Sequence, residues 1–514
     1  MDPHPIEIMT SRGAVRGSQQ GGVSAFLGIP YAEPLAESRR FDAPTRARAW
    51  DGVFEADEFG PRPPQYPFPG RPMPVPTDGH HLDGQYLTVD VWTPAASGTG
   101  ELPVMVWFYG GSFRVGSTAD PIHSGATLAG DGDVVVVTVN YRIGAEGYLA
   151  LEDVPDNRAL LDQVLALQWV RDEIGAFGGD PARVTIFGES SGGASVATLM
   201  VAPPARGLFC RAIAQSVPGT FFSPELAEDI SRELLAPRGL PRTAAAVGAL
   251  SRAELTVLVR GLELRMPSLR RWGPVSTGPT PFCPVMDGES LPADVWQALA
   301  RGDARDVELL VGHTRDEWRM FLAMAQQLDG VPPGAVRDAA WMWGPGPRDT
   351  AEERQRAARE GISETELFTV LMSDGAFRMP SAHLATAHVR GGGTAFRYEL
   401  TWASPLYGGA LGAGHGLDIA LVLGTIADAA LYMGEEPPAS AYRLSAQMRG
   451  VWRRFASTGD PGWAPTGETA WPTRVFDGDD EPHVSEYPEV ASRELWAPYP
   501  PTTLQLLPPE REVP

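Results

Sequence analysis

Two stretches of the chain are almost continuously apolar over a length typical of strands. Residues 102–111 read LPVMVWFYGG and residues 133–142 read DVVVVTVNYR. Unbroken runs of this length, rich in valine, indicate strands that are buried on both faces, as in a parallel sheet. Residues 157–177 (NRALLDQVLALQWVRDEIGAF) follow and read as a helix. Strands that alternate with helices predict an α/β fold, in which the ligand crevice lies at the carboxyl ends of the strands.

The second half of the chain has a different pattern. Residues 223–390 are more polar and mostly helical in pattern, with one strand-like interruption at residues 306–314 (DVELLVGHT). We expect most of this stretch to form helical insertions that cover the crevice. A further strand is predicted at residues 393–402. Residues 441–459 predict a helix that ends at a glycine. The prolines of residues 61–76 forbid helix and central strand, so this segment is expected to be a surface loop.

The composition narrows the classes of ligand. A net charge of −22 disfavours binding to nucleic acid or to an anionic membrane surface. No apolar run reaches the roughly 20 residues of a membrane-spanning helix, and the first residues have neither a basic leader nor an apolar signal core. Cys210 and Cys283 are too few for a disulfide framework or a cysteine-based zinc site. These features predict a cytoplasmic protein whose ligands are small molecules.

Residues 186–195 (IFGESSGGAS) place two adjacent serines between glycines. The preceding residues 183–187 predict a strand and the following residues a helix of small side chains, so the serines stand in a sharp strand-to-helix turn. Only Ser190 fits the frame G-x-S-x-G, because a nucleophile at Ser191 would put Glu189 where glycine is needed. Ser190 is therefore the candidate nucleophile, with an ordinary N-cap serine as the alternative.

A serine nucleophile needs a base, an acid that orients the base, and donors for the oxyanion. The glycine pair at residues 109–113 (YGGSF) follows an apolar strand and is a candidate for backbone donors. His415 lies in the glycine-flanked loop GAGHGLD and is the candidate base. The segment VELLVGHTRDEW supplies Asp316 and Glu317, either of which fits the acid by position, while His313 in the same loop is a competing base.

With these segments assembled, the sequence resembles the type-B carboxylesterase family, which includes cholinesterases and bacterial para-nitrobenzyl esterases. The resemblance covers nearly the whole chain in family order, through FLGIPYA, VWFYGGSF, VTVNYRIGAEGYL, NRALLDQVLALQWVRDEIGAFGGDPARVTIFGESSGG, AIAQS, VGHTRDE and GAGHGLD. It implies an α/β-hydrolase fold, with a large mixed and mostly parallel sheet flanked by helices. It also implies that residues 1–514 form a single domain, with residues 223–390 as mainly helical insertions around an active-site gorge, including the acid-bearing strand end near residue 317.

The functional residues of the family correspond to positions of this chain one by one. Ser190 matches the nucleophile, His415 the general base and Glu317 the acid, which decides against Asp316. The oxyanion donors match the backbone N–H groups of Gly111, Ser112 and Ser191. Ser216 in AIAQS matches a buried serine that supports the triad by hydrogen bonding.

The residues of the predicted pocket match the family pattern in part and depart from it in part. Met320 and Phe321 resemble residues that line the acyl side, and the aromatic stretch at residues 341–343 offers further surface to the gorge. Trp318 stands where the family usually has a small residue, so its indole either reshapes the pocket wall or packs outward. Proline follows Val217 where the family tends to glycine.

Two ion pairs of the family are affected differently. The chain reads GQYL where the family has Glu-Asp-Cys-Leu, so the first-loop disulfide cannot form and Arg40 loses its usual carboxylate. Asp83 and Asp42 are the candidate substitutes. Arg142 and Asp162 match the second ion pair, which is expected to be intact.

The resemblance implies a serine hydrolase that cleaves neutral, moderately bulky aryl or alkyl esters through an acyl-enzyme. No metal or organic cofactor is implied, and the protein is expected to be a monomer or a homodimer. Hydrolysis of amides or carbamates uses the same triad and is the alternative activity. Some relatives of this fold have lost triad members and serve as adhesion ectodomains, but this chain retains all three.

Overall fold

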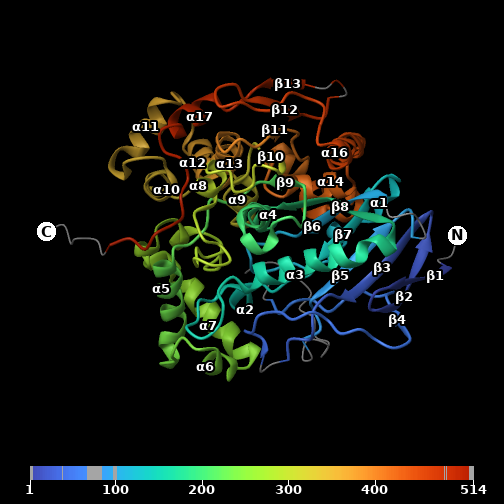
Figure 1. Ribbon diagram of the computed structural model, residues 1–514. Coiled ribbons are helices and arrows are strands. Elements are labelled where there is room, and N and C mark those ends of the chain that lie inside the picture. The colour runs from blue at the N-terminus through green and yellow to red at the C-terminus, as the bar shows by residue number, and fades with distance from the viewer. Residues whose placement is uncertain are drawn as a thin grey trace.

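The computed structural model describes residues 4–36, 39–65, 84–96, 101–479, 481 and 483–508. Within this part of the chain, one sheet of thirteen strands runs from the N-terminal to the C-terminal strands (Figure 1). Residues 61–65 of the predicted proline-rich loop form neither helix nor strand, and residues 66–76 lie outside the described residues.

The sheet is mixed, with a parallel centre. In the order of the sheet, each pair of neighbouring strands from β7 to β12 is parallel. The pairs at the two ends of this centre, β5 with β7 and β12 with β13, are antiparallel. The strand order is β1 (His4–Thr10), β2 (Gly13–Gln20), β3 (Val23–Pro30), β5 (Thr88–Thr93), β7 (Val135–Val139), β6 (Leu102–Phe108), β8 (Gly179–Glu189), β9 (Arg211–Gln215), β10 (Glu308–Thr314), β11 (Ala395–Leu400), β12 (Pro472–Phe476) and β13 (His483–Glu486), with β4 (Val53–Glu55) beside β2. The two apolar runs predicted as buried strands form β6 and β7 at the centre, which confirms that prediction.

Helices pack on the sheet in two contacting groups. The first group passes from α3 (Arg158–Glu173) to α4 (Ser191–Val201), α8 (Val295–Ala300) and α13 (Met379–Arg390). The second group joins α1 (Ala126–Gly130), α14 (Leu417–Leu423) and α16 (Ala439–Thr458). Because α4 begins where β8 ends and contacts β8 and β9, the start of α4 lies at the carboxyl edge of the parallel centre.

Residues 223–390 consist largely of helices, interrupted by β10. The helices are α5 (Pro224–Leu235), α6 (Ala244–Gly248), α7 (Arg252–Arg265), α8, α9 (Arg319–Met324), α10 (Ala335–Trp343), α11 (Ala351–Ala357), α12 (Glu364–Ser373), the π-helix η10 (Asp374–Arg378) and α13. In Figure 1, α5 to α7 and α10 to α12 lie on the side of the molecule opposite the N-terminal strands. Three further short α-helices are α2 (Gly144–Tyr148) before α3, α15 (Ala430–Met433) between α14 and α16, and α17 (Val490–Trp496) after β13.

The expected ion pair between Arg142 and Asp162 is present. Both side chains are fully buried, and the guanidinium is bidentate, with Nε and Nη2 lying 2.8 and 2.6 Å from the two carboxylate oxygens. Burial opposes the charge on Arg142, but Asp162 more than compensates and raises the pKa of the guanidinium. The pair ties the segment after β7 to α3.

Arg40 has a different carboxylate partner from those considered in the sequence. Its guanidinium donates to the carbonyls of Val247 and Leu250, at 2.8 and 2.5 Å, and forms an ion pair of 3.9 Å with Glu146. Asp42 pairs with the neighbouring Arg39 instead. The other candidate, at position 83, lies outside the described residues.

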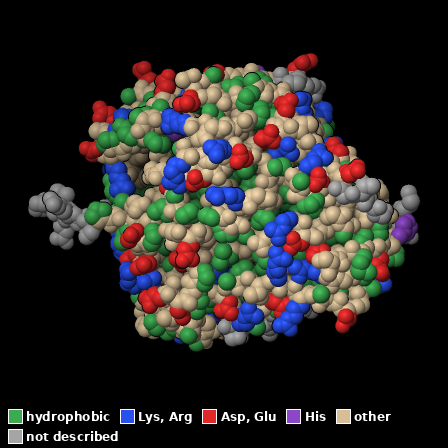
Figure 2. All heavy atoms as spheres, in the orientation of Figure 1, with side chains coloured by type: hydrophobic (Ala, Val, Ile, Leu, Met, Phe, Trp, Pro, Cys, Tyr) green, Lys and Arg blue, Asp and Glu red, His purple; other side chains and the backbone are tan. Residues whose placement is uncertain are grey.

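The surface shows no segregation of charge on the face drawn in Figure 2, where basic and acidic side chains are interspersed. The net charge of −22 is therefore not gathered into one patch on this face. Among the described residues, no helix combines the length and the apolar character needed to cross a membrane.

Candidate active site

Ser190 is the one residue between the end of β8 and the start of α4. Its backbone angles, φ 56° and ψ −125°, lie outside the regions that residues with a side chain usually adopt. The turn depends on two glycines, because a Cβ on Gly192 would lie 2.0 Å from the carbonyl oxygen of Phe108, and a Cβ on Gly188 would lie 2.6 Å from the same oxygen. The G-x-S-x-G spacing thus has a steric cause, and it holds the serine in a strained backbone conformation at the turn.

The structure brings Ser190, His415 and Glu317 into one hydrogen-bonded chain. The Ser190 Oγ lies 2.8 Å from Nε2 of His415, and Nδ1 of the same ring lies 2.5 Å from Oε2 of Glu317. His415 comes from the loop before α14, and Glu317 follows β10. All three side chains are at least nine-tenths buried, so bulk water does not compete for these hydrogen bonds.

Glu317 is held by two further donors. The hydroxyl of Ser216 and the N–H of Thr314 donate to its Oε1, at 2.6 and 3.0 Å. Burial opposes ionisation of this carboxyl, but His415 and these hydrogen bonds prevail and hold its pKa below the usual value. Ser216 therefore lies where the family resemblance places a supporting serine. The carboxylate is fixed as an acceptor that points at the imidazole.

Asp316, the other carboxylate left open by position, faces away from the imidazole. It accepts a hydrogen bond of 3.0 Å from the N–H of Ala413 and lies 3.5 and 3.7 Å from Arg315 and Arg319. Its contacts position the loop that carries His415 rather than the ring itself.

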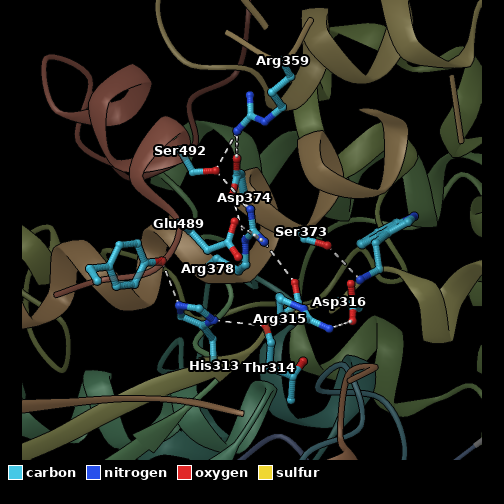
Figure 3. A network of polar contacts seen from close by, with 12 residues as sticks. His313, Thr314, Arg315, Asp316, Arg359, Ser373, Asp374, Arg378, Glu489 and Ser492 are labelled. Atoms are coloured by element: carbon cyan, nitrogen blue, oxygen red, sulfur yellow. Dashed lines mark hydrogen bonds and ion pairs between the residues drawn. The ribbon is translucent and has the colours of Figure 1, made fainter. Parts of the chain in front are cut away.

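His313, the competing base, belongs to the polar network drawn in Figure 3. Its Nε2 lies 2.8 Å from the Tyr487 hydroxyl and its Nδ1 lies 3.1 Å from the Thr314 carbonyl. Burial lowers its pKa to about 4, so the ring is neutral near pH 7. This histidine is a structural residue beneath the site.

The three predicted oxyanion donors lie beside Ser190. Gly111 and Ser112 follow β6 with φ of 122° and 57°, and Ser191 is the first residue of α4. A Cβ on Gly111 would lie 2.1 Å from the carbonyl oxygen of Val115, so only glycine fits this turn. Because Ser191 begins a helix, its N–H is one of the orphan donors that helix N-termini present to anions.

Glu189 is a residue of the site that the sequence reasoning missed. Its Oε1 lies 3.2 Å from Nε2 of His415, the nitrogen that also faces Ser190. Burial raises the pKa of Glu189 to about 8. Burial alone would lower the pKa of His415, but Glu189 and Glu317 raise it to about 9. The motif places Glu189 next to Ser190 in the sequence, but the contact of its carboxylate with Nε2 of His415 is a tertiary feature that the motif does not show.

The Glu189→Gln variant is expected to shift the acid limb of the kcat/KM profile to lower pH by about 1 to 2 units. A base at His415 must be neutral, so activity rises as pH increases through its pKa. Glu189, with a pKa of about 8, is ionised at the pH where His415 titrates, near 9, so removing its charge destabilises the imidazolium and lowers the pKa of His415. The measurement is kcat/KM for an uncharged ester between pH 5 and 10. Asp428→Asn is the matched control, because it neutralises an exposed carboxylate that lines the same cavity, about 590 Å³ in volume, as Glu189 and His415. An unmoved limb in Glu189→Gln would contradict the assignment.

Two aromatic rings restrict the imidazole. The ring of Phe377 lies 4.1 Å from that of His415 between centroids, and Phe321 lies 5.4 Å away. Phe377 is part of the π-helix η10, whose Asp374 and Arg378 pair with one another within the network of Figure 3. The network that contains His313 therefore also anchors the segment that packs against His415.

Two cavities open beside Ser190. The wide cavity, about 590 Å³, is lined among others by Gly110, Glu189, Ser190, Met320, Phe321 and His415. The narrow cavity, about 30 Å³, is lined among others by Ser112, Ser190, Ser191, Pro218, Trp318 and Phe377. Trp318 is 8% exposed and stacks on Phe321 at 4.4 Å, so its indole forms pocket wall and does not pack outward. Of the predicted aromatic stretch, Trp343 lines the narrow cavity, whereas Trp341 packs against Arg270 and Arg348.

In the part of the chain that the structure describes, no group of three or more His, Cys, Asp or Glu side chains is arranged to hold a metal ion. A nucleophile, a base, an oriented acid and amide donors around one point are the parts of an acyl-transfer site.

Known proteins resemble this chain over nearly its whole length. The carboxylesterase family model matches residues 4–493. The para-nitrobenzyl esterase of Bacillus subtilis (strain 168) is 33% identical over 472 residues, covering 90% of this chain and 92% of that protein. The phenmedipham hydrolase of Pseudarthrobacter oxydans is 32% identical over 479 residues, covering 92% of this chain and 93% of that protein.

Solved structures agree with these relatives. A PNB esterase structure superposes with a TM-score of 0.82 at 31% identity, covering 95% of this chain and 99% of that one. A carboxylesterase of Geobacillus stearothermophilus superposes with a TM-score of 0.80 at 30% identity, with the same coverage of 95% and 99%. Because the family match, the relatives and the sheet with its flanking helices all extend over nearly the whole chain, this protein belongs to the carboxylesterase family and is a carboxylic-ester hydrolase of the α/β-hydrolase fold.

Proposed function

We propose that Ser190, His415 and Glu317 are the catalytic triad with which this esterase forms and hydrolyses an acyl-enzyme. The observation that carries the proposal is the unbroken chain of contacts from Oγ through the imidazole to the carboxylate, at 2.8 and 2.5 Å. His415 takes the hydroxyl proton as Oγ attacks the ester carbonyl, and then gives it to the oxygen of the leaving alcohol. Water repeats the cycle on the acyl-enzyme, and Glu317 keeps the ring in the tautomer that accepts at Nε2.

The amides of Gly111, Ser112 and Ser191 are proposed to hold the oxyanion. Their turn after β6 and the start of α4 meet at Ser190, where negative charge develops on the carbonyl oxygen. Donors that are fixed before the reaction need no reorganisation, and each is worth about 2.7 to 4 kcal/mol in comparable sites. The second serine of the motif thus acts through its main chain.

The leaving alcohol is proposed to occupy the wide cavity. His415 lines the wide cavity, and a general acid must lie beside the oxygen that it protonates. Met320 and Phe321 then contact the alcohol part, although the family resemblance suggested the acyl side for them. The acyl part is then left with the narrow cavity, which Ser190, Ser112 and Ser191 line. Ser112 also lines the wide cavity, so the proposed oxyanion site lies between the two.

The wall of the wide cavity favours a neutral alcohol part. Its charged groups are largely paired within the protein: Arg114 lies 2.9 Å from Glu263, and Asp120 pairs with Arg62. Burial lowers the pKa of His123 in the same wall to about 4, so this ring is neutral as well. Neutral aryl or alkyl esters with a bulky alcohol part are therefore the proposed substrates.

The protein is expected to hydrolyse p-nitrophenyl acetate at least about a thousandfold faster, in kcat/KM, than p-nitroacetanilide. The two compounds share the acyl group and the ring, but the anilide nitrogen must be protonated as it leaves, a step that depends on general acid catalysis worth about 10² to 10⁴. The measurement is the initial rate of release of nitrophenol or nitroaniline. Comparable values for the two substrates would favour an amide hydrolase instead.

We propose a single domain over residues 1–514, supported by one sheet that continues from β1 to β13. We propose a monomer or a homodimer, and a cytoplasmic location, with which the two free thiols of Cys210 and Cys283 agree.

A further inference from the structure

A third cavity lies behind the narrow one. This rear cavity has a volume of about 320 Å³ and is lined by residues 342–346 and 499–505, with Gly219 and Gly375 among the others. The narrow cavity has only about 30 Å³, which is room for about two groups of the size of a water molecule or a methyl. A small space next to Ser190 is thus backed by a much larger one.

The wall between these two cavities is one residue thick. Pro218 and Thr220 line the narrow cavity, while Gly219 between them lines the rear one. In the π-helix η10, Gly375 lines the rear cavity and the next residue the narrow one. Trp343 at the end of α10 lines both cavities, so this residue is part of the wall between them.

We propose that the indole of Trp343 limits the length of the acyl group that this esterase accepts. The proposal rests on the proposed function, in which the acyl group points into the narrow cavity. An acetyl or propionyl group fills that cavity, and a longer chain meets the indole. Without the indole, the narrow cavity would continue into the rear cavity and take a chain of several more carbons.

The position of the indole is fixed by its surroundings. Trp343 is 6% exposed, and its Nε1 donates a hydrogen bond of 3.0 Å to the Thr277 hydroxyl. Trp318 packs beside it, with ring centroids 6.3 Å apart. A Cβ on Gly375 would lie 2.6 Å from the Trp343 carbonyl oxygen, so the end of α10 sits directly on the π-helix. The indole is therefore a fixed partition in the resting structure.

The backbone parts of the wall are tied together independently of Trp343. The N–H of Gly219 donates to the carbonyl of Ala376 at 2.9 Å. The π-helix is anchored from outside by Arg359, which lies 3.3 Å from Asp374, and by Ser492, whose hydroxyl accepts from Arg378 at 3.1 Å (Figure 3). Removal of the indole is thus expected to open the wall without moving the loop or the π-helix.

The test is the acyl-length profile for p-nitrophenyl esters from acetate to decanoate, which keeps the leaving group constant. In the unaltered protein, kcat/KM is expected to fall at least about tenfold between propionate and hexanoate, since a pocket that lacks room for a methylene loses 10- to 200-fold. In Trp343→Ala, the ratio of octanoate to acetate is expected to rise at least about tenfold. Trp343→Leu is expected to give an intermediate ratio and is a second variant should the alanine variant fold poorly.

Trp341→Ala is the matched control, because this tryptophan lies on the same helix against Arg270 and Arg348 and lines neither the narrow nor the rear cavity. Its profile should equal that of the unaltered protein. Active Trp343 variants with an unchanged profile would overturn the inference, as would a preference of the unaltered protein for octanoate over acetate. Absence of any hydrolysis by the unaltered protein would instead count against the proposed function.

Discussion

Replacement of Ser190 by alanine is expected to lower kcat/KM for p-nitrophenyl acetate by about 10⁶-fold, the loss seen when the nucleophile of a serine triad is removed. The Oγ lies 2.8 Å from the imidazole and is the proposed attacking atom, so no acyl-enzyme can form without it. A residual acceleration of about 10³ to 10⁴ over water should remain, because the amide donors and the binding cavities are unchanged. The initial burst of nitrophenol, one per active site, should disappear with the steady-state rate.

Ser191→Ala is the control for this experiment. The Ser191 hydroxyl has no hydrogen-bond partner among the described residues, and alanine keeps the backbone N–H that is proposed to hold the oxyanion. Its kcat/KM should stay within about tenfold of the unaltered value, well below the loss expected for the nucleophile. A Ser190→Ala variant that keeps more than about one hundredth of the activity would remove Ser190 from the mechanism, and a large loss in Ser191→Ala alone would reverse the choice between the two serines.

The sequence predicted those parts of the site whose position depends on steric contacts within a turn and on the end of a buried strand. The continuous apolar runs of β6 and β7 have no polar face, which leaves the centre of a sheet as their only place. The glycines at positions 188 and 192 are required because β8 and α4 pass so close to Phe108. Ser190 and the turn that carries it follow from such short-range rules.

The choice of acid needed more than position. Asp316 and Glu317 are adjacent, and a turn directs neighbouring side chains to different sides. Only the family resemblance favoured Glu317, and the structure shows why the two differ: Glu317 faces the imidazole, and Asp316 faces the backbone of Ala413.

Contacts between distant side chains could not be predicted from the sequence. Arg40 forms its ion pair with Glu146 and not with Asp42, which is close to it in the sequence. The reason is that α2 places the carboxylate of Glu146 next to Arg40. Trp341 and Trp343 looked equivalent in sequence, yet residues two apart on a helix point in different directions. Only the placement of α10 beside the π-helix decides which indole reaches the cavities.

Replacement of Glu317 by glutamine is expected to lower kcat by about 10⁴-fold with little change in KM, as when the acid of such a triad becomes an amide. Glu317 accepts from the Ser216 hydroxyl and the Thr314 N–H at Oε1, and from Nδ1 of His415 at Oε2. Glutamine has one acceptor oxygen. If that oxygen stays with the two fixed donors, the amide NH₂ faces Nδ1 and drives the proton to Nε2, where the ring can no longer accept from Ser190.

Asp316→Asn is the matched control, because it neutralises the adjacent carboxylate and keeps the same shape. Asparagine can still accept from the N–H of Ala413, so the loop that carries His415 should keep its place and kcat should stay within about tenfold. Thermal unfolding of each variant, compared with the unaltered protein, separates loss of the fold from loss of chemistry. If Asp316→Asn loses more activity than Glu317→Gln while both remain folded, the acid of the triad is Asp316, and the tautomer argument built on the 2.5 Å contact fails.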